Sequence, residues 1–293
     1  MTAIPLPPTS NLKTLRIRDA EYLEDSSGLH VYHVTDPHAL IQAAGYLKFI
    51  NGPSDEAIYF RGQTRLHASL SPTLFRDSSS QRAHSIRVNK LSSVTEEACS
   101  RLKIFSQFDK KAYEPLLQHY GFRTTWIDLV DNVWVSLWFS CHKARSTGRL
   151  GEYLHFEKRN PATDPAPFAY ILLVAVDSDP DPYIPGFYKG KNTEMIDLRI
   201  ACPSIFLRPH AQHGVLFRAR GVPGAQRPGD YISQLRGVIR IRLDDALAWL
   251  GDGKMLGVHA LFPPPYYDHG YSQLLASKLT GHPMLGMIAH IGA

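Results

Sequence analysis

Residues 116–141 read LLQHYGFRTTWIDLVDNVWVSLWFSC, a polar, glycine-containing turn followed by a strongly apolar segment. Trp134, Leu137, Trp138 and Cys141 recur at helical spacing in its second half, which predicts a helix that packs this stripe into the core. Asp131 precedes the stripe and is the expected N-cap, because its carboxylate can accept free N–H groups of the first turn. We therefore expect a buried helix that holds the polar residues ahead of it in place.

Three separate segments carry the polar residues of a candidate site. His119, Thr125 and Asp128 stand in the turn before the expected helix. Arg61-Gly62-Gln63 follows the apolar residues 57–60, which predict a buried strand whose end presents the polar side chains. The third segment surrounds Gln212. We predict that the three segments form one pocket.

The composition is that of a globular protein, with 44% apolar and 20% charged residues in a chain of 293. This length predicts one main domain at 36–293, preceded by an extension at 1–35 that contains short strands. Three cysteines without metal-binding spacing support neither a disulfide framework nor a zinc site. The longest apolar run, 169–176, is too short to cross a bilayer, so we expect a cytoplasmic protein without a membrane partner.

The net charge of +5 alone implies no nucleic-acid partner, but the arginines are concentrated between residues 199 and 242. Arginine suits bidentate contacts to phosphate, so this segment could form a basic face that binds nucleic acid. A solvated face without a ligand is the equally weighted alternative. The arginines are Arg199, Arg208, Arg218, Arg220, Arg227, Arg236, Arg240 and Arg242.

Apolar periodicity and turn residues predict an alternation of strands and helices along the chain. Strands are expected at 15–18, 29–33, 57–60, 125–127, 168–176, 215–219 and 238–243. Helices are expected at 39–49, 86–108, 112–119, 244–250 and 269–279 and after Asp131, with Thr95 as a possible start of a second segment in 86–108. Residues 148–167 are predicted to be a loop.

Each candidate residue also has a structural alternative. A strand-end arginine such as Arg61 often only supports the fold, and a histidine at a helix C-terminus such as His119 often only faces the helix dipole. His210 and His213 lie three residues apart without a third ligand, so no metal site is predicted.

Several motifs, taken in their order along the chain, resemble the FRG domain over about residues 39–279. They are Phe60-Arg61-Gly62-Gln63, Gln118-His119-Tyr120-Gly121, Leu137-Trp138-Phe139-Ser140, and Arg208 with Gln212-His213-Gly214-Val215-Leu216-Phe217. The family usually has a run such as TRLLDWT after its HYG, whereas this chain has TTWIDLV at 124–130. FRG domains occur mostly in bacterial proteins, often near mobile-element or phage-defence genes.

The motif order is also remotely similar to that of ADP-ribosyltransferases, which use NAD as a substrate. The resemblance implies an α+β fold in which helices flank a central mixed or antiparallel split sheet. It aligns Arg61 with the first-motif arginine, Thr125 or its neighbour with the middle motif, and Gln212 to Gly214 with the glutamate motif. Gly214 then stands where the catalytic glutamate would be, so proton transfer would fall to Asp128 or His119.

The resemblance implies two overlapping sets of site residues. The catalytic set is Arg61, His119, Thr125, Asp128 and Gln212. The set that would bind NAD is Phe60, Arg61, Gly62, Gln63, Tyr120 and Arg208.

The predicted function is transfer of ADP-ribose from NAD to a macromolecule, as a toxin or phage-defence effector. One alternative is a non-catalytic module that binds a nucleotide, or binds nucleic acid through residues 199–242. Another is hydrolysis of an unknown substrate with His119 as general base.

Overall fold

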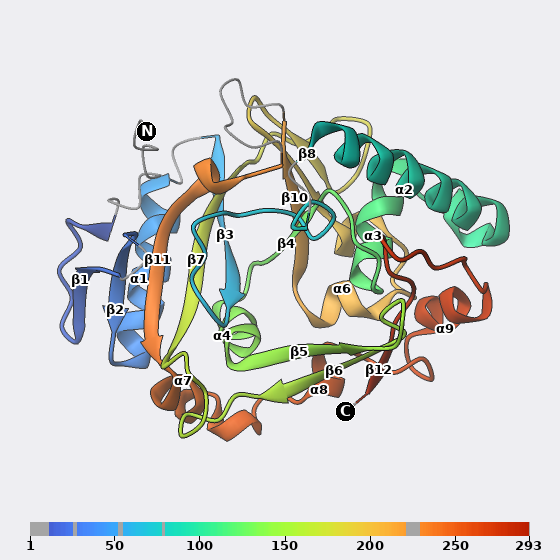
Figure 1. Cartoon of the computed structure of the whole chain (residues 1–293). Helices are drawn as coiled ribbons and strands as arrows, with labels where there is room; N and C mark the ends of the chain where they lie inside the picture. Colours follow the sequence, from blue (N-terminus) through green and yellow to red (C-terminus); the bar gives the residue numbers. More distant parts are fainter. Residues whose placement is uncertain (1–11, 26–27, 52–54, 78–79, 221–228, 293) are drawn as a thin grey trace.

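The computed structural model describes residues 12–25, 28–51, 55–77, 80–220 and 229–292, and its centre is a nine-stranded sheet (Figure 1). Along this sheet the strand order is β1-β2-β11-β7-β3-β4-β10-β9-β8. Only β2 and β11 pair in parallel; the other neighbours are antiparallel. The strands are β1 Ala20–Glu24, β2 His30–Val34, β3 Glu56–Gln63, β4 Ile127–Val130, β7 Phe168–Asp177, β8 Phe187–Lys189, β9 Thr193–Asp197, β10 Gly214–Ala219 and β11 Leu235–Arg242.

A three-stranded sheet lies in front of α4 in Figure 1 and contributes to the site described below. Its strands are β5 His142–Thr147, β6 Tyr153–Lys158 and β12 His290–Gly292. The helices are α1 Pro37–Asn51, α2 Gln81–Arg101, α3 Tyr113–His119, α4 Val133–Cys141, α5 Leu198–Ala201, α6 Leu207–Ala211, α7 Leu243–Trp249, α8 Val258–Leu261 and α9 His269–Ala276. None of the helices in the described ranges is both long and apolar enough to span a membrane.

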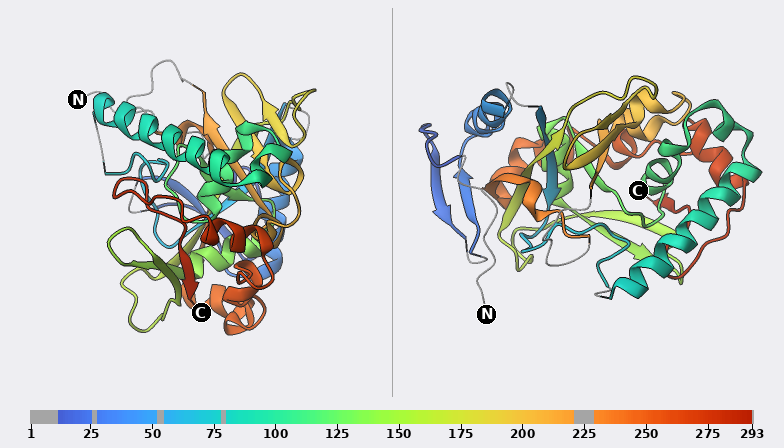
Figure 2. Two further views of the ribbon diagram at one scale, coloured as in Figure 1. Left: turned by 90° about the vertical axis from the view of Figure 1, so that its right-hand side faces the viewer. Right: turned by 90° about the horizontal axis from the view of Figure 1, so that it is seen from above.

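The helices divide into two groups around the large sheet. On one face α1, α4 and α7 bury apolar residues against β3, β7 and β11, with Ile171 and Leu173 of β7 pointing into this layer. Leu172 and Val174, which alternate with them, point into a second layer with Leu70 and Tyr231. At the end of the sheet opposite β1, helices α2, α3 and α9 surround a third apolar cluster (Figure 2). The α+β fold with flanking helices is therefore confirmed.

The large sheet opens between β3 and β4. These two strands share a single pair of facing residues, Phe60 and Val130, whereas β3 pairs with β7 along its whole length from Glu56 to Gln63. Beyond Phe60 the main chains of β3 and β4 no longer pair, and the Arg61 side chain bridges them by donating from Nη1 to the Asp128 carbonyl at 2.7 Å. Polar residues of both strands therefore line the opening.

Several local predictions from the sequence are wrong. Residues 15–18 form no strand, residues 148–167 contain β6, and α2 runs without interruption through Thr95, whose hydroxyl donates to the Leu91 carbonyl. The N-cap of α4 is Asn132, which accepts from the amides of residues 134 and 135. Asp131 instead binds Arg199, at 2.7 Å. The ion pair with the distant Arg199 therefore engages the Asp131 carboxylate, which the local sequence pattern had predicted to cap α4.

Gly62 is expected to be essential for packing of α4 on β3. A Cβ atom at this position would lie 1.9 Å from the Ser136 carbonyl oxygen and 2.9 Å from the Ser140 nitrogen, both backbone atoms of α4. The helix would have to move, so we expect Gly62→Ala to lower the free energy of unfolding by about 1–3 kcal/mol in urea denaturation. Gly45→Ala is the control, because Gly45 lies in α1 with open space around it and alanine favours a helix. Equal effects of both substitutions would contradict this role for Gly62.

Candidate functional site

A cavity of about 650 Å³ lies at the opening between β3 and β4. The three polar segments converge on it: residues 60–63 of β3, residues 118–121 at the end of α3, and the segment from α6 to the start of β10, which contributes Arg208, Gln212 and Gly214. Strand β4 adds residues 128–130. The remaining wall comes from α4, the small sheet, the residue before β12 and the residue after α8. Its residues are Phe139, His142, Lys143, Ala144, Leu154, Phe156, Phe262, Ala289 and Ile291.

Arg61 is held in the opening by the Asp128 carbonyl, while its Nε has no hydrogen-bond partner within the described part of the chain. Burial and, to a smaller extent, the nearby Arg76 lower the pKa of the Arg61 guanidinium to about 10, against the opposing effect of Asp128. The group nevertheless stays cationic at neutral pH. It therefore presents a positive charge and a free N–H donor at the cavity.

His119 ends α3, and its side chain is only 2% exposed. Its Nε2 lies 3.9 Å from Asp128 Oδ1 and has no hydrogen-bond partner among the described residues. Burial lowers the pKa of His119; Arg208 also lowers it, whereas Asp128 and hydrogen bonding by Gln212 raise it. The imidazole is therefore neutral at pH 7 and able to accept a proton.

Gly214 makes room for this histidine. A Cβ atom on Gly214 would lie 2.5 Å from His119 Cε1 and 3.0 Å from Nε2. A side chain of any kind at this position would displace the imidazole. A glutamate side chain would therefore not fit at position 214, because the His119 ring occupies the space.

Arg208 is 1% exposed and enclosed by aromatic rings. Its guanidinium carbon lies 4.3 Å from the centre of the Tyr120 ring, 4.6 Å from Tyr271 and 5.4 Å from Phe262. Nη1 donates to the His119 carbonyl at 2.5 Å, but Nε and Nη2 lack hydrogen-bond partners in the described ranges. These two nitrogens lie along one edge of the guanidinium, the edge with which arginine binds carboxylate or phosphate.

Asp268 fixes the aromatic cage around Arg208. It is fully buried, accepts from the Tyr120 hydroxyl at 2.7 Å and from the Arg208 amide at 3.2 Å through Oδ2, and accepts from the Tyr271 amide at 2.8 Å through Oδ1. The sequence interpretation missed this residue. Its position directly before α9 is typical of an N-cap, which is the signal that could have identified it.

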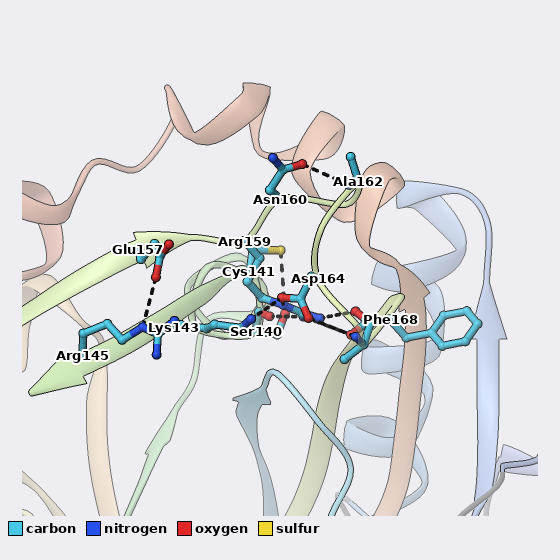
Figure 3. Close-up of polar contacts among 11 residues, drawn as sticks. Ser140, Cys141, Lys143, Arg145, Glu157, Arg159, Asn160, Ala162, Asp164 and Phe168 are labelled. Atoms are coloured by element: carbon cyan, nitrogen blue, oxygen red, sulfur yellow. Dashed lines mark hydrogen bonds and ion pairs between the residues drawn. The ribbon is translucent and has the colours of Figure 1, made fainter.

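The charge of the described cavity lining is strongly positive. Arg61, Arg76, Lys143 and Arg208 are its cations, and Asp128 is the sole carboxylate among the lining residues of the described chain. Lys143 is held at the wall by an ion pair of 2.7 Å with Asp164 (Figure 3). This imbalance favours an anionic ligand.

Unpaired polar atoms support the same conclusion. Five atoms of the lining are buried without a hydrogen-bond partner among the described residues: Arg61 Nε, Gln63 Oε1, His119 Nε2, and Arg208 Nε and Nη2. Each costs about 1–3 kcal/mol when it is left unsatisfied. Because these five unpaired atoms all lie around one cavity, the cavity is suited to hydrogen-bond a ligand.

Thr125 does not reach the cavity. Its amide and its hydroxyl both donate to Glu114 Oε1, at 2.8 and 2.7 Å. Thr124 is fully buried and donates to Gln118. The side chain of Thr125 is therefore held away from the cavity, because a carboxylate eleven residues upstream binds both of its donors.

The arginines of residues 199–242 do not form one free basic face. Arg208 lies inside the molecule, and Arg227 is outside the described residues. The other six are paired with carboxylates that all lie outside this segment: Arg199 with Asp131 and Asp197, Arg218 and Arg220 with Glu194, Arg236 with Glu56, Arg240 with Asp25, and Arg242 with Asp244. A neighbouring carboxylate therefore offsets the positive charge of each of these six arginines.

Comparison with known proteins identifies the segment that contains the core of the cavity. Residues 56–149 match the family model of the FRG domain. The chain contains an FRG domain. The matched segment runs from β3 to the end of β5 and includes Arg61, His119 and Asp128, whereas Arg208 and Gln212 lie outside it. No curated protein and no solved structure matches the chain.

The described residues contain no group of three or more His, Cys, Asp or Glu side chains that could hold a metal ion. The cavity is lined by arginine, histidine and amide groups, which suit anions and hydrogen-bonding ligands.

Acidification from pH 7.5 to 5.5 is expected to lower the free energy of unfolding. Burial lowers the pKa of His119 and of His142 in the folded chain, so the unfolded chain binds protons more readily below about pH 6.5. Stability is therefore lost as the pH falls through this value, and the loss stops below the folded pKa values. Urea denaturation of His119→Gln should show a shallower pH dependence than the wild type. An unchanged pH dependence would contradict burial of a neutral His119.

Proposed function

We propose that this FRG-domain protein binds NAD or a related nucleotide in the cavity and transfers ADP-ribose to a macromolecule. The observation that carries the proposal is the convergence of Arg61, His119, Arg208 and Gln212 on one positively charged cavity with unpaired donors. The volume of about 650 Å³ lies within the range of about 300–1,000 Å³ that is usual for ligand pockets.

Each residue has a role that its contacts support. Arg61, with Arg76 close to it, presents positive charge for the diphosphate. Gln212 is fixed by donation from Nε2 to the Leu261 carbonyl at 2.9 Å and supports the His119 ring next to it. Asp128 is half-exposed, 3.9 Å from His119, and faces the cavity with the charge needed near a developing positive charge on ribose.

The proposed reaction replaces one bond at C1′ of the ribose by another. The bond from C1′ to the nicotinamide nitrogen breaks, and nicotinamide leaves as a neutral molecule with the bonding electrons. A nucleophile of the macromolecule forms the new bond to C1′ and gives its proton to His119. The lowered pKa keeps His119 in the neutral form that this step needs. Such a reaction would suit a toxin or a phage-defence effector.

Substitution of Arg61 tests the binding step. We expect Arg61→Ala to weaken NAD binding about 10- to 100-fold in isothermal titration calorimetry, because charge-assisted hydrogen bonds contribute about 1.5–3 kcal/mol. Arg242→Ala is the matched control: Arg242 pairs with Asp244 on the surface and does not line the cavity, so affinity should stay unchanged.

Transfer is tested with labelled NAD and a cell extract as the source of acceptors. The wild type should label a macromolecule and release nicotinamide, and His119→Gln should retain NAD binding while losing label. A wild-type protein that neither binds nor consumes NAD at micromolar concentration would refute the proposed function.

A further inference from the structure

Three phenylalanines form an aromatic wall on one side of the cavity: Phe139 of α4, Phe156 of β6 and Phe262 after α8. The rings of Phe156 and Phe262 are stacked, with centroids 4.4 Å apart and an interplanar angle of 27°. Phe139 meets the Phe262 ring edge-on at 6.1 Å. Phe139 and Phe156 are only partly buried, and as lining residues they present apolar surface to the cavity.

The aromatic wall and the pair Arg61 and Arg76 are separate parts of the cavity lining. A chain of short contacts connects them: Arg61 binds the Asp128 carbonyl, Asp128 lies 3.9 Å from His119, and the His119 carbonyl accepts from Arg208. Arg208 in turn lies against Phe262. At the other end of this chain, Arg76 is close enough to Arg61 to lower its pKa. His119 is the middle member of this chain of contacts.

We infer that the ligand has two chemically different parts, a planar ring that stacks on the aromatic wall and an anionic group bound at Arg61 and Arg76. This inference rests on the proposed function and specifies how the nucleotide lies. A flat π-system gains contact area and favourable ring geometry against Phe156, while phosphate oxygens match the guanidinium donors. The sugar between ring and phosphate then lies beside His119.

The inference is tested by titrating ligands with and without a ring. NAD, ADP and inorganic pyrophosphate are titrated into the wild type, Phe156→Leu and Arg76→Ala. The control is Tyr153→Leu, because Tyr153 is an exposed aromatic residue that lies in β6 with Phe156 but does not line the cavity. We expect Phe156→Leu to weaken NAD and ADP about 5- to 50-fold and to leave pyrophosphate within about twofold, since base stacking contributes about 1–3 kcal/mol. Arg76→Ala should weaken all three ligands, and Tyr153→Leu none.

The outcomes separate this inference from the proposed function. If NAD binds the wild type and Phe156→Leu leaves its affinity intact, the aromatic wall is no ring site although the proposed function stands. Equal losses for ADP and pyrophosphate in a folded Phe156→Leu variant also overturn the inference. If NAD fails to bind but ADP binds with the expected pattern, the ring site is supported and the proposed function fails. Absence of binding by all three ligands overturns both.

Discussion

Replacement of Arg159 by methionine is expected to lower the free energy of unfolding by about 3–5 kcal/mol, because it leaves the buried Asp164 carboxylate without its main partner. Arg159 is 2% exposed, and its Nε donates to Asp164 at 2.9 Å (Figure 3). The remaining donors bind main-chain carbonyls: Nη1 those of Ser140 and Phe168, and Nη2 that of Ala166. This arginine therefore ties α4, β7 and the connection between β6 and β7 together.

The electrostatics of Asp164 explain why the effect is large. Burial alone raises the pKa of this carboxyl, but hydrogen bonds from Arg159 and Lys143 outweigh it and hold the pKa well below its usual range. The group thus stays charged inside the protein, and loss of Arg159 leaves Lys143 as the one cation in contact with it in the described chain.

The matched control for this prediction is Arg145→Met in β5. Arg145 pairs with Glu157 at 3.0 Å, but both side chains are more than half exposed. Exposed ion pairs contribute about 0–1 kcal/mol, so urea denaturation should show little change. If both variants lose equal stability, the buried network around Arg159 is no more important than a surface pair.

The sequence predicts the parts of the site that depend on neighbouring residues. The apolar residues before Arg61 place it in a buried strand, and the polar groups around His119 stand where a short helix ends. Residues 153–158 lie within the loop that was predicted at 148–167, but they form β6. Leu154 and Phe156 alternate with exposed neighbours, and this period-two pattern could have identified β6.

Contacts between distant segments explain what the sequence could not show. Asp131 and Asn132 are equally suitable N-caps, and the choice depends on Arg199, which binds Asp131 from 68 residues away. A hydrogen bond to Glu114 holds the Thr125 side chain away from the cavity. The aromatic wall combines residues from three segments that have no common motif. In each case the contact partner of a side chain depends on which distant segments the fold brings together.

Arg208→Met is expected to separate ligand binding from stability. Methionine removes a buried charge whose Nε and Nη2 have no partners in the described chain, and its thioether can pack against the rings of Tyr120 and Tyr271. The lost bond from Nη1 to the His119 carbonyl opposes this gain, and Asp268 keeps its three hydrogen bonds from the hydroxyl of Tyr120 and the two amides. The free energy of unfolding should therefore change by at most about 1–2 kcal/mol.

NAD affinity of the same variant is expected to fall about 30- to 1,000-fold, since a buried charged partner in an interface contributes about 2–5 kcal/mol. Arg208→Lys keeps a positive charge but lacks the paired donors of the guanidinium edge, so it should also bind weakly. Calorimetric titration and urea denaturation of the same preparations provide the comparison. A residue that serves ligand binding must affect NAD affinity more than stability. A large loss of stability in Arg208→Met with unchanged NAD affinity would therefore show that Arg208 supports the fold.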